Sequence, residues 1–211
     1  STQPCHLVEI RGGSKRNAIP REAFAELMVL DTAVEELGSL LEEETGRIKT
    51  ELGGREKGLE VTIASSDKGN QKVFDENSQK TLVDLLLALP HGVATMSYDI
   101  EGLVETSNNL ATIGTISGEV LIGTSTRSSI KSALKALRDR ISATARLAGA
   151  AVEEDEPYPG WAPDLDSEIL KVVKEVHKEV FGKEPEMKAI HAGLECGIIG
   201  EKYPGMDMVS F

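Results

Sequence analysis

The sequence predicts an α+β fold, in which an antiparallel sheet with helices packed on one face is followed by a piece of an α/β sheet. Three observations predict it. Short segments that alternate apolar and polar residues indicate half-buried strands, and longer segments with apolar residues at helical spacing separate them. Two of the strand segments are joined by a short connection of the kind that makes a hairpin. A run rich in proline, Pro157–Pro163, then places a domain boundary near residue 160.

The first elements are two extended segments and a helix. Cys5–Ile10 alternates apolar and polar residues as a half-buried strand does. Asn17–Pro20 and Ala23–Leu30 together predict a second extended stretch. Asp31 is expected to cap a helix that runs to about Leu52, where two glycines end it.

A similar unit follows, and it leads into a hairpin. Leu59–Ala64 alternates as a strand, and Asn77–Leu89 predicts a helix ended by the next proline. Val104–Ile116 and Glu119–Thr126 are two strands separated only by Ser-Gly, which predicts an antiparallel hairpin.

The remaining elements are mostly helical. Ser128–Leu147 and Asp166–Phe181 carry apolar residues on one helical face. Between the second of these helices and the end of the chain we expect a strand at Met187–His191, a glycine-rich turn into a short helix, and a last strand at Met206–Phe211. Both terminal segments are strand-like, so we expect the chain to be cut from a larger architecture.

Composition excludes several classes of function. The 35 acidic and 23 basic residues give a net charge of −12, which argues against binding to a nucleic-acid backbone. No apolar run is long enough to cross a bilayer, and the two distant cysteines suggest neither a disulfide framework nor a zinc knuckle, so we expect a soluble protein of a reducing cytoplasm. The acidic run Glu153–Glu156 is interpreted as a solvated surface segment, because four adjacent side chains do not converge without a special turn.

The histidines do not form a recognisable metal site. None of the four has a partner at the spacing of known zinc motifs. His191 stands apart, because it opens a turn of small residues between a predicted strand and a helix, where open α/β sheets place ligands. The residues alone leave a functional and a structural role for His191 equally open.

Arg127 is a candidate for binding an anion. It lies where the second hairpin strand ends and a helix begins. The planar guanidinium fits a carboxylate with two parallel hydrogen bonds. A role as a surface residue is the alternative that the residues leave open.

Several segments, taken together, point to a known family. The most important motif is HAGLECG at His191–Gly197. The others, in chain order, are Arg16–Ala23, Val104–Asn109, Lys135–Gly149, Tyr158–Trp161, Tyr203–Pro204 and Met206–Ser210. In their sequence and order they resemble the aminoacyl-histidine dipeptidases (Xaa-His dipeptidases) of the dinuclear zinc metallopeptidase/aminoacylase superfamily. The resemblance spans nearly the whole chain.

The resemblance implies a domain organisation. Residues 1–160 correspond to a lid domain of the dimerisation type, entered partway, and residues 161–211 to part of the carboxyl-terminal section of a catalytic domain. In the family, two zinc ions are bound mostly by residues outside such a segment, and so is the general base. We therefore expect no zinc bound by this chain, no catalytic residue within it, and no activity of the isolated chain.

The resemblance also implies a substrate-binding site. Asn17, Arg127 and Gly193 match positions that hold the carboxyl end of the dipeptide in similar enzymes. The chemistry agrees, since a carboxylate needs a charge-assisted donor, an amide N–H and a close backbone N–H. His191 and Glu195 are expected to shape the loop that carries Gly193.

The function expected on this basis is hydrolysis of Xaa-His dipeptides by the full-length, zinc-dependent enzyme, with this chain contributing recognition of the substrate carboxylate. The alternative is a non-catalytic ligand-binding or dimerisation module of lid-like fold. The expected partner is the dipeptide, and a homodimer is left open.

Overall fold

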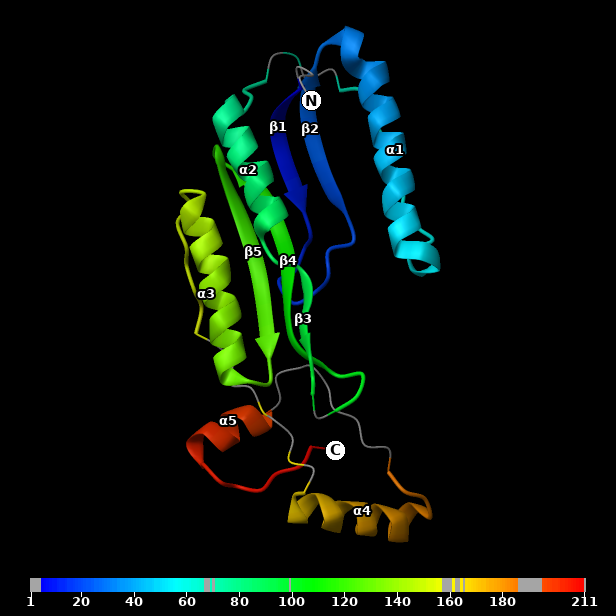
Figure 1. Cartoon of the computed structure of the whole chain (residues 1–211), viewed down its shortest axis with the longest axis vertical. Helices are drawn as coiled ribbons and strands as arrows, with labels where there is room; N and C mark the ends of the chain where they lie inside the picture. Colours follow the sequence, from blue (N-terminus) through cyan, green and yellow to red (C-terminus); the bar gives the residue numbers. More distant parts are fainter. Residues whose placement is uncertain are drawn as a thin grey trace.

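The computed structural model describes residues 5–66, 69, 71–98, 100–156, 161, 164, 166–185 and 195–210. Within these residues, five strands form one antiparallel sheet (Figure 1). They are β1 (Cys5–Gly12), β2 (Ala23–Val29), β3 (Gly92–Met96), β4 (Val104–Ile116) and β5 (Glu119–Ser128). The predicted α+β class with antiparallel strands is confirmed.

The sheet is organised around β4. The hairpin strand β5 pairs with β4 from Ile116↔Glu119 to Thr106↔Ser128, as the Ser-Gly connection predicts. Because a strand has only two edges, β3 and β1 share the other edge of β4. β3 pairs with the first part of β4, β1 pairs with it near Gly114, and β2 extends the sheet beyond β1.

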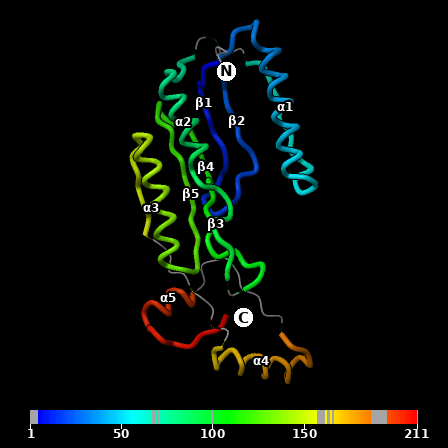
Figure 2. The backbone as a smooth tube through the Cα atoms, in the orientation of Figure 1, coloured from blue at the N-terminus to red at the C-terminus, as the bar shows by residue number. Residues whose placement is uncertain are grey.

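Two helices cover one face of this sheet. α2 (Glu76–Ala88) contacts β1, α3 (Lys131–Leu147) contacts β4 and β5, and the two helices contact each other (Figure 2). The predicted packing of helices on one face is therefore confirmed. The buried apolar side chains of the described chain are Leu7, Ala33, Leu82, Leu85, Leu89, Ala111 and Leu137.

The start of α2 supplies the hydrogen bonds that β1 lacks along one edge. Gln79 accepts a bond from the Leu7 backbone N–H at 2.7 Å through Oε1 and donates one to the Cys5 carbonyl at 3.1 Å through Nε2. Farther along β1, the Thr115 hydroxyl bonds both backbone groups of Ile10, at 3.1 and 3.2 Å. A side-chain amide and a hydroxyl thus replace a neighbouring strand where β1 and β4 diverge.

The helix after β2 differs from its prediction at one end. Asp31 lies in a short 3₁₀ turn, Asp31–Ala33, and makes no capping bond to α1, which begins at Val34. The helix ends at Leu52 as predicted, since Gly53 adopts a φ of +58°. α1 has no buried residue and lies beside β2 in Figure 1.

Three strand predictions are wrong for a common reason. Leu59–Ala64 and residues 206–210 are not in strands, and Asn17–Pro20 belongs to the connection between β1 and β2. Alternating polarity favours an extended chain, but a strand also needs a neighbouring edge to pair with. β3 was missed, because Gly92–Met96 is too short to show a clear alternation.

Beyond residue 160 the described elements are α4 (Glu168–Phe181) and α5 (Glu195–Lys202), which agree with the two predicted helices. Ser167 caps α4, and its hydroxyl also donates to Asp207 at 2.5 Å. The predicted strand Met187–His191 lies outside the described residues. The division of the chain at residue 160 stays a prediction.

Candidate binding pocket

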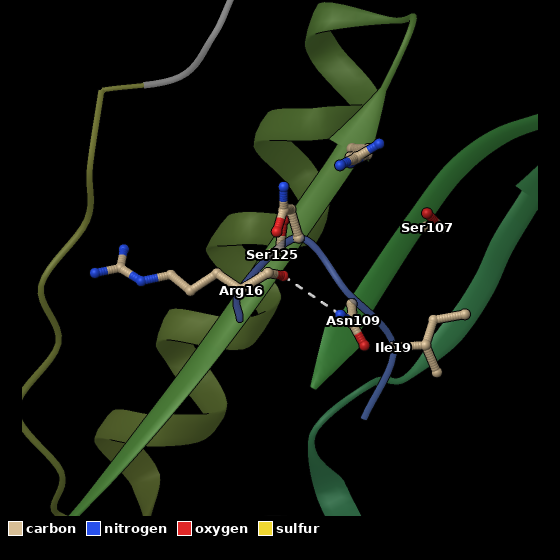
Figure 3. A pocket seen from close by; sticks show the side chains of 7 residues that line it. Arg16, Ile19, Ser107, Asn109 and Ser125 are labelled. Atoms are coloured by element: carbon tan, nitrogen blue, oxygen red, sulfur yellow. Dashed lines mark hydrogen bonds between the residues drawn. The ribbon is translucent and has the colours of Figure 1, made fainter. Parts of the chain in front are cut away.

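A pocket of about 260 Å³ lies between the β4–β5 hairpin and the connection from β1 to β2 (Figure 3). It is lined by Arg16, Asn17, Ile19, Ser107, Asn109, Ser125 and Arg127. Two of the residues that the sequence singled out, Asn17 and Arg127, therefore lie on one pocket although 110 positions separate them in the chain. Among the described residues, the lining carries two arginines and no acidic residue.

The hairpin register explains why four of these side chains converge. Ser107 faces Arg127 across the two strands, and Asn109 faces Ser125. Since side chains alternate between the faces of a sheet, all four lie on the same face. The intervening residues turn to the helices, where Thr106 and Asn108 are each 2% exposed.

The face toward the helices is held by its own hydrogen bonds. The hydroxyls of Thr106 and Ser128 are 2.8 Å apart, and Thr126 donates to the Asn108 side chain at 2.9 Å. The Asn108 amide donates to the carbonyl of Pro90 at 2.6 Å. These buried bonds fix the register of β4 against β5, and the register fixes which side chains reach the pocket.

The connection between β1 and β2 is pressed onto the sheet at its base. Gly13 has a φ of +65°, and a Cβ built on it would lie 1.9 Å from the Ala111 carbonyl oxygen. Its N–H donates to the Glu22 carbonyl at 3.1 Å, which closes residues 13–22 into a loop. The opposing residue, Ala111, is in a β-bulge of β4 and has no exposed surface. Only glycine fits this close approach.

Farther along the loop, Asn109 of β4 bonds two of its carbonyls. Nδ2 donates to the carbonyl of Arg16 at 3.3 Å (Figure 3). It also donates to the carbonyl of Ala18 at 2.8 Å. The Oδ1 atom of Asn109 is buried and has no hydrogen-bond partner within the described part of the chain.

The outer side of the loop is tied to the segment after α3. The Arg16 guanidinium, which Figure 3 shows directed away from Asn109, forms an ion pair with Asp155. Arg138 of α3 donates to the Asp155 carbonyl and pairs with Glu154, both at 2.8 Å. The interpretation of Glu153–Glu156 as a solvated surface segment is confirmed, since all four residues are exposed. Within that segment, α3 and the loop bring basic side chains to Glu154 and Asp155.

Glu154 shows the electrostatic effect of these contacts. A hydrogen bond from Ser142 at 2.7 Å, and in second place the nearby Arg138 guanidinium, hold the pKa of the Glu154 carboxyl below its usual range. The carboxylate is therefore charged at neutral pH and anchors the segment to α3.

The structure does not place the other predicted site residues at this pocket within the part of the chain that it describes. Gly193 and His191 lie outside the described residues. Glu195 is the first residue of α5 and is exposed. Sequence reasoning assigned no role to Ser107, Asn109 or Ser125, although the two-residue periodicity of the predicted hairpin carried the signal that places them beside Arg127.

The described residues do not fit a zinc site. Nowhere in the described ranges do three or more histidine, cysteine, aspartate or glutamate side chains gather so that they could hold a metal ion.

Among the described helices, none has the length and apolar character that a membrane crossing requires. The chemistry that the pocket offers is the binding of an anion by Arg127 with neutral donors beside it.

Comparison with known proteins identifies relatives of one kind. No protein-family model matches the chain. The chain is 38% identical over 204 residues to the cytosol non-specific dipeptidase of Escherichia coli (strain K12), a match that covers 97% of this chain and 42% of the relative. The crystal structure of aminoacylhistidine dipeptidase from Vibrio alginolyticus matches with a TM-score of 0.87 and 41% identity, over 98% of this chain and 42% of that chain.

The chain is homologous to these dipeptidases. Identity of this level together with agreement in fold over nearly the whole chain confirms the resemblance drawn from the motifs. The relatives are hydrolases that act on peptide bonds. The chain spans less than half the length of the relatives that it matches.

Proposed function

We propose that this chain supplies the recognition of the substrate carboxylate in a zinc-dependent dipeptidase that hydrolyses Xaa-His dipeptides. The observation that carries the proposal is the convergence of Asn17 and Arg127 on one pocket. The two residues belong to different segments of the chain. Both match the carboxylate-binding positions that the family resemblance implies. Gly193 is proposed as the third group that holds the carboxylate.

The chemistry of the pocket supports this assignment. Arg127 offers a cation with two parallel donors, and the Asn17 amide offers a neutral one. Although the whole chain is acidic, the described residues of the lining include no carboxylate. A free carboxyl terminus is the group on a dipeptide that this combination suits best.

The rest of the reaction is assigned to other parts of the whole protein. Two zinc ions are proposed for the full-length enzyme, where they would supply the hydrolytic chemistry. The part that we propose for this chain in the reaction is binding of the substrate carboxylate. We further propose residues 1–160 as the lid, residues 161–211 as part of the catalytic domain, and the cytoplasm as the location.

Calorimetric titration with glycyl-histidine tests the proposal. We expect the wild-type chain to bind the dipeptide and Arg127→Ala to bind it roughly ten- to hundredfold more weakly, the usual cost of a lost charge-assisted bond. Arg140→Ala is the matched control, since Arg140 is an exposed arginine of α3 outside the pocket. Equal binding of glycyl-histidine amide, which has no carboxylate, would refute the proposal.

Activity of the isolated chain gives an independent test. Incubated with zinc and glycyl-histidine, the 211-residue chain is expected to show no turnover. Turnover at a rate typical of an enzyme would contradict the assignment of zinc binding and catalysis to other parts of the whole protein.

A dimerisation module is the second candidate. Within the described residues, β2 pairs only with β1, and its exposed side chains include Phe24 and Met28. An edge strand with exposed apolar side chains can pair with a second copy. If sedimentation shows a dimer while neither wild type nor Arg127→Ala binds the dipeptide, this candidate replaces the first.

A further inference from the structure

Asn109 holds the pocket loop at two points that flank one residue. Its Nδ2 donates to the carbonyls of Arg16 and Ala18, and Asn17 lies between them. The amide therefore fixes the backbone on both sides of the residue that is proposed to contact the carboxylate.

The orientation of the amide follows from its neighbours. The two loop carbonyls are acceptors, so only the NH₂ end of the side chain can face them. Both hydrogens are then engaged, and Oδ1 turns the other way. There it is buried without a hydrogen-bond partner in the described ranges.

The buried Oδ1 bears on what this residue is for. A buried acceptor without a partner destabilises the fold, and this loss offsets the gain from the two bonds that Nδ2 makes. An apolar side chain of similar shape would avoid the loss. Asn109 therefore adds little to global stability, and its distinct contribution is to hold the loop.

The remaining contacts show why the loop needs this bond. Gly13 fixes the base of the loop against Ala111, and Arg16 pairs with Asp155 on its outer side. Both partners of that ion pair are largely exposed, so the pair holds the loop weakly. Ile19, just beyond Asn17, is 75% exposed and adds little packing.

We propose that Asn109 is a positioning residue, which fixes Asn17 at the pocket by holding the carbonyls on either side of it. The inference rests on the proposed function, because it assumes that Asn17 contacts the ligand. Without the two bonds from Asn109, which we call the clamp, the loop samples arrangements in which Asn17 points elsewhere. The affinity for a carboxylate then falls in proportion to the fraction of chains in which the loop is correctly placed.

The test compares Asn109→Leu with Ser125→Ala in the full 211-residue chain. Leucine keeps the approximate shape of asparagine and removes both donors. Ser125, the cross-strand neighbour of Asn109, lines the same pocket, and within the described ranges its side chain bonds none of the loop carbonyls. The readouts are the ¹⁵N order parameters of residues 16–19, the melting temperature, and the affinity for glycyl-histidine.

We expect Asn109→Leu to lower the loop order parameters from about 0.85 toward 0.6 and to leave the melting temperature nearly unchanged. If the loop places Asn17 correctly only about one tenth of the time, glycyl-histidine should bind about tenfold more weakly. Ser125→Ala should leave the loop order parameters at their wild-type values. Unchanged loop dynamics in Asn109→Leu, or an equal loss in both variants, would overturn the inference.

Two measurements distinguish failure of the proposed function from failure of this inference. If the wild-type chain does not bind glycyl-histidine, the proposed function fails, while the order parameters still decide whether the clamp exists. If Asn109→Leu does not fold, hydrogen exchange of the Asn109 side-chain amide in the wild-type chain tests the clamp instead. Both Nδ2 hydrogens of Asn109 should then exchange with solvent far more slowly than those of an exposed asparagine, and free exchange would refute the clamp.

Discussion

Replacing Gly13 by alanine is expected to lift the pocket loop from the sheet. The new methyl group would lie 1.9 Å from the Ala111 carbonyl oxygen, in a backbone conformation with a φ of +65°. Ordinary contact requires the loop or β4 to move by roughly 1.5 Å. Because Ala111 is fully buried in the central strand, we expect the loop to move.

Two terms contribute to the expected loss of stability. The left-handed conformation costs an alanine about 1–2 kcal/mol, and relief of the overlap costs a further 1–2 kcal/mol or so. For a chain of this length, a total of about 2–4 kcal/mol lowers the melting temperature by roughly 4–16 °C. Displacement of the loop also moves Asn17, so binding of glycyl-histidine should weaken.

Thermal unfolding by circular dichroism and calorimetric titration would measure the two effects. Gly182→Ala is the matched control, because Gly182 has a φ of +69° and open space around its Cβ position. It should show the conformational term alone and bind the dipeptide normally. If Gly13→Ala and Gly182→Ala behave alike in both assays, the close approach does not shape the pocket.

Two further changes test how the fold is held together. Gln79→Ala leaves the Leu7 N–H and the Cys5 carbonyl without their partner, so we expect a loss of about 2 kcal/mol in urea unfolding, whereas an unchanged midpoint would contradict the edge-pairing role. The pKa of the Asp207 carboxyl is lowered by hydrogen bonds from the Ser167 hydroxyl and, in second place, the Ile169 N–H. Its folded pKa therefore lies below its unfolded value, so its stabilising effect is present above the unfolded value and is lost as the pH falls below about 4. Melting curves should show wild type and Asp207→Asn converging in acid, and a constant difference down to about pH 2 would refute the linkage.

Much of the architecture follows from local patterns. The alternation in Val104–Ile116 and the Ser-Gly connection predicted a hairpin that the structure confirms, because side-chain period and turn chemistry are properties of neighbouring residues. The helices Glu76–Ala88 and Glu168–Phe181 were predicted to within two residues at each end for the same reason.

Local patterns do not predict which segments pair when they are far apart in the sequence. Leu59–Ala64 alternates as well as a true strand but finds no edge in the described sheet, and Gly92–Met96 pairs with β4 although its own sequence shows little sign of it. Asp31 has the chemistry of a helix cap, yet the chain enters the helix through a 3₁₀ turn that places Ala33 at the start. For the two strand segments, the outcome depends on a pairing edge that is distant in the sequence.

The sequence by itself determined the α+β class, the hairpin, and the identity of Asn17 and Arg127 as candidates for binding a carboxylate. Only the tertiary structure decided that these two residues share a pocket, that Asn109 bonds the loop that carries Asn17, and that Asp155 pairs with Arg16. The physical reason is the distance along the chain. Strand register and loop closure join segments about a hundred residues apart, and no local pattern encodes which carbonyl or carboxylate will lie opposite a given side chain.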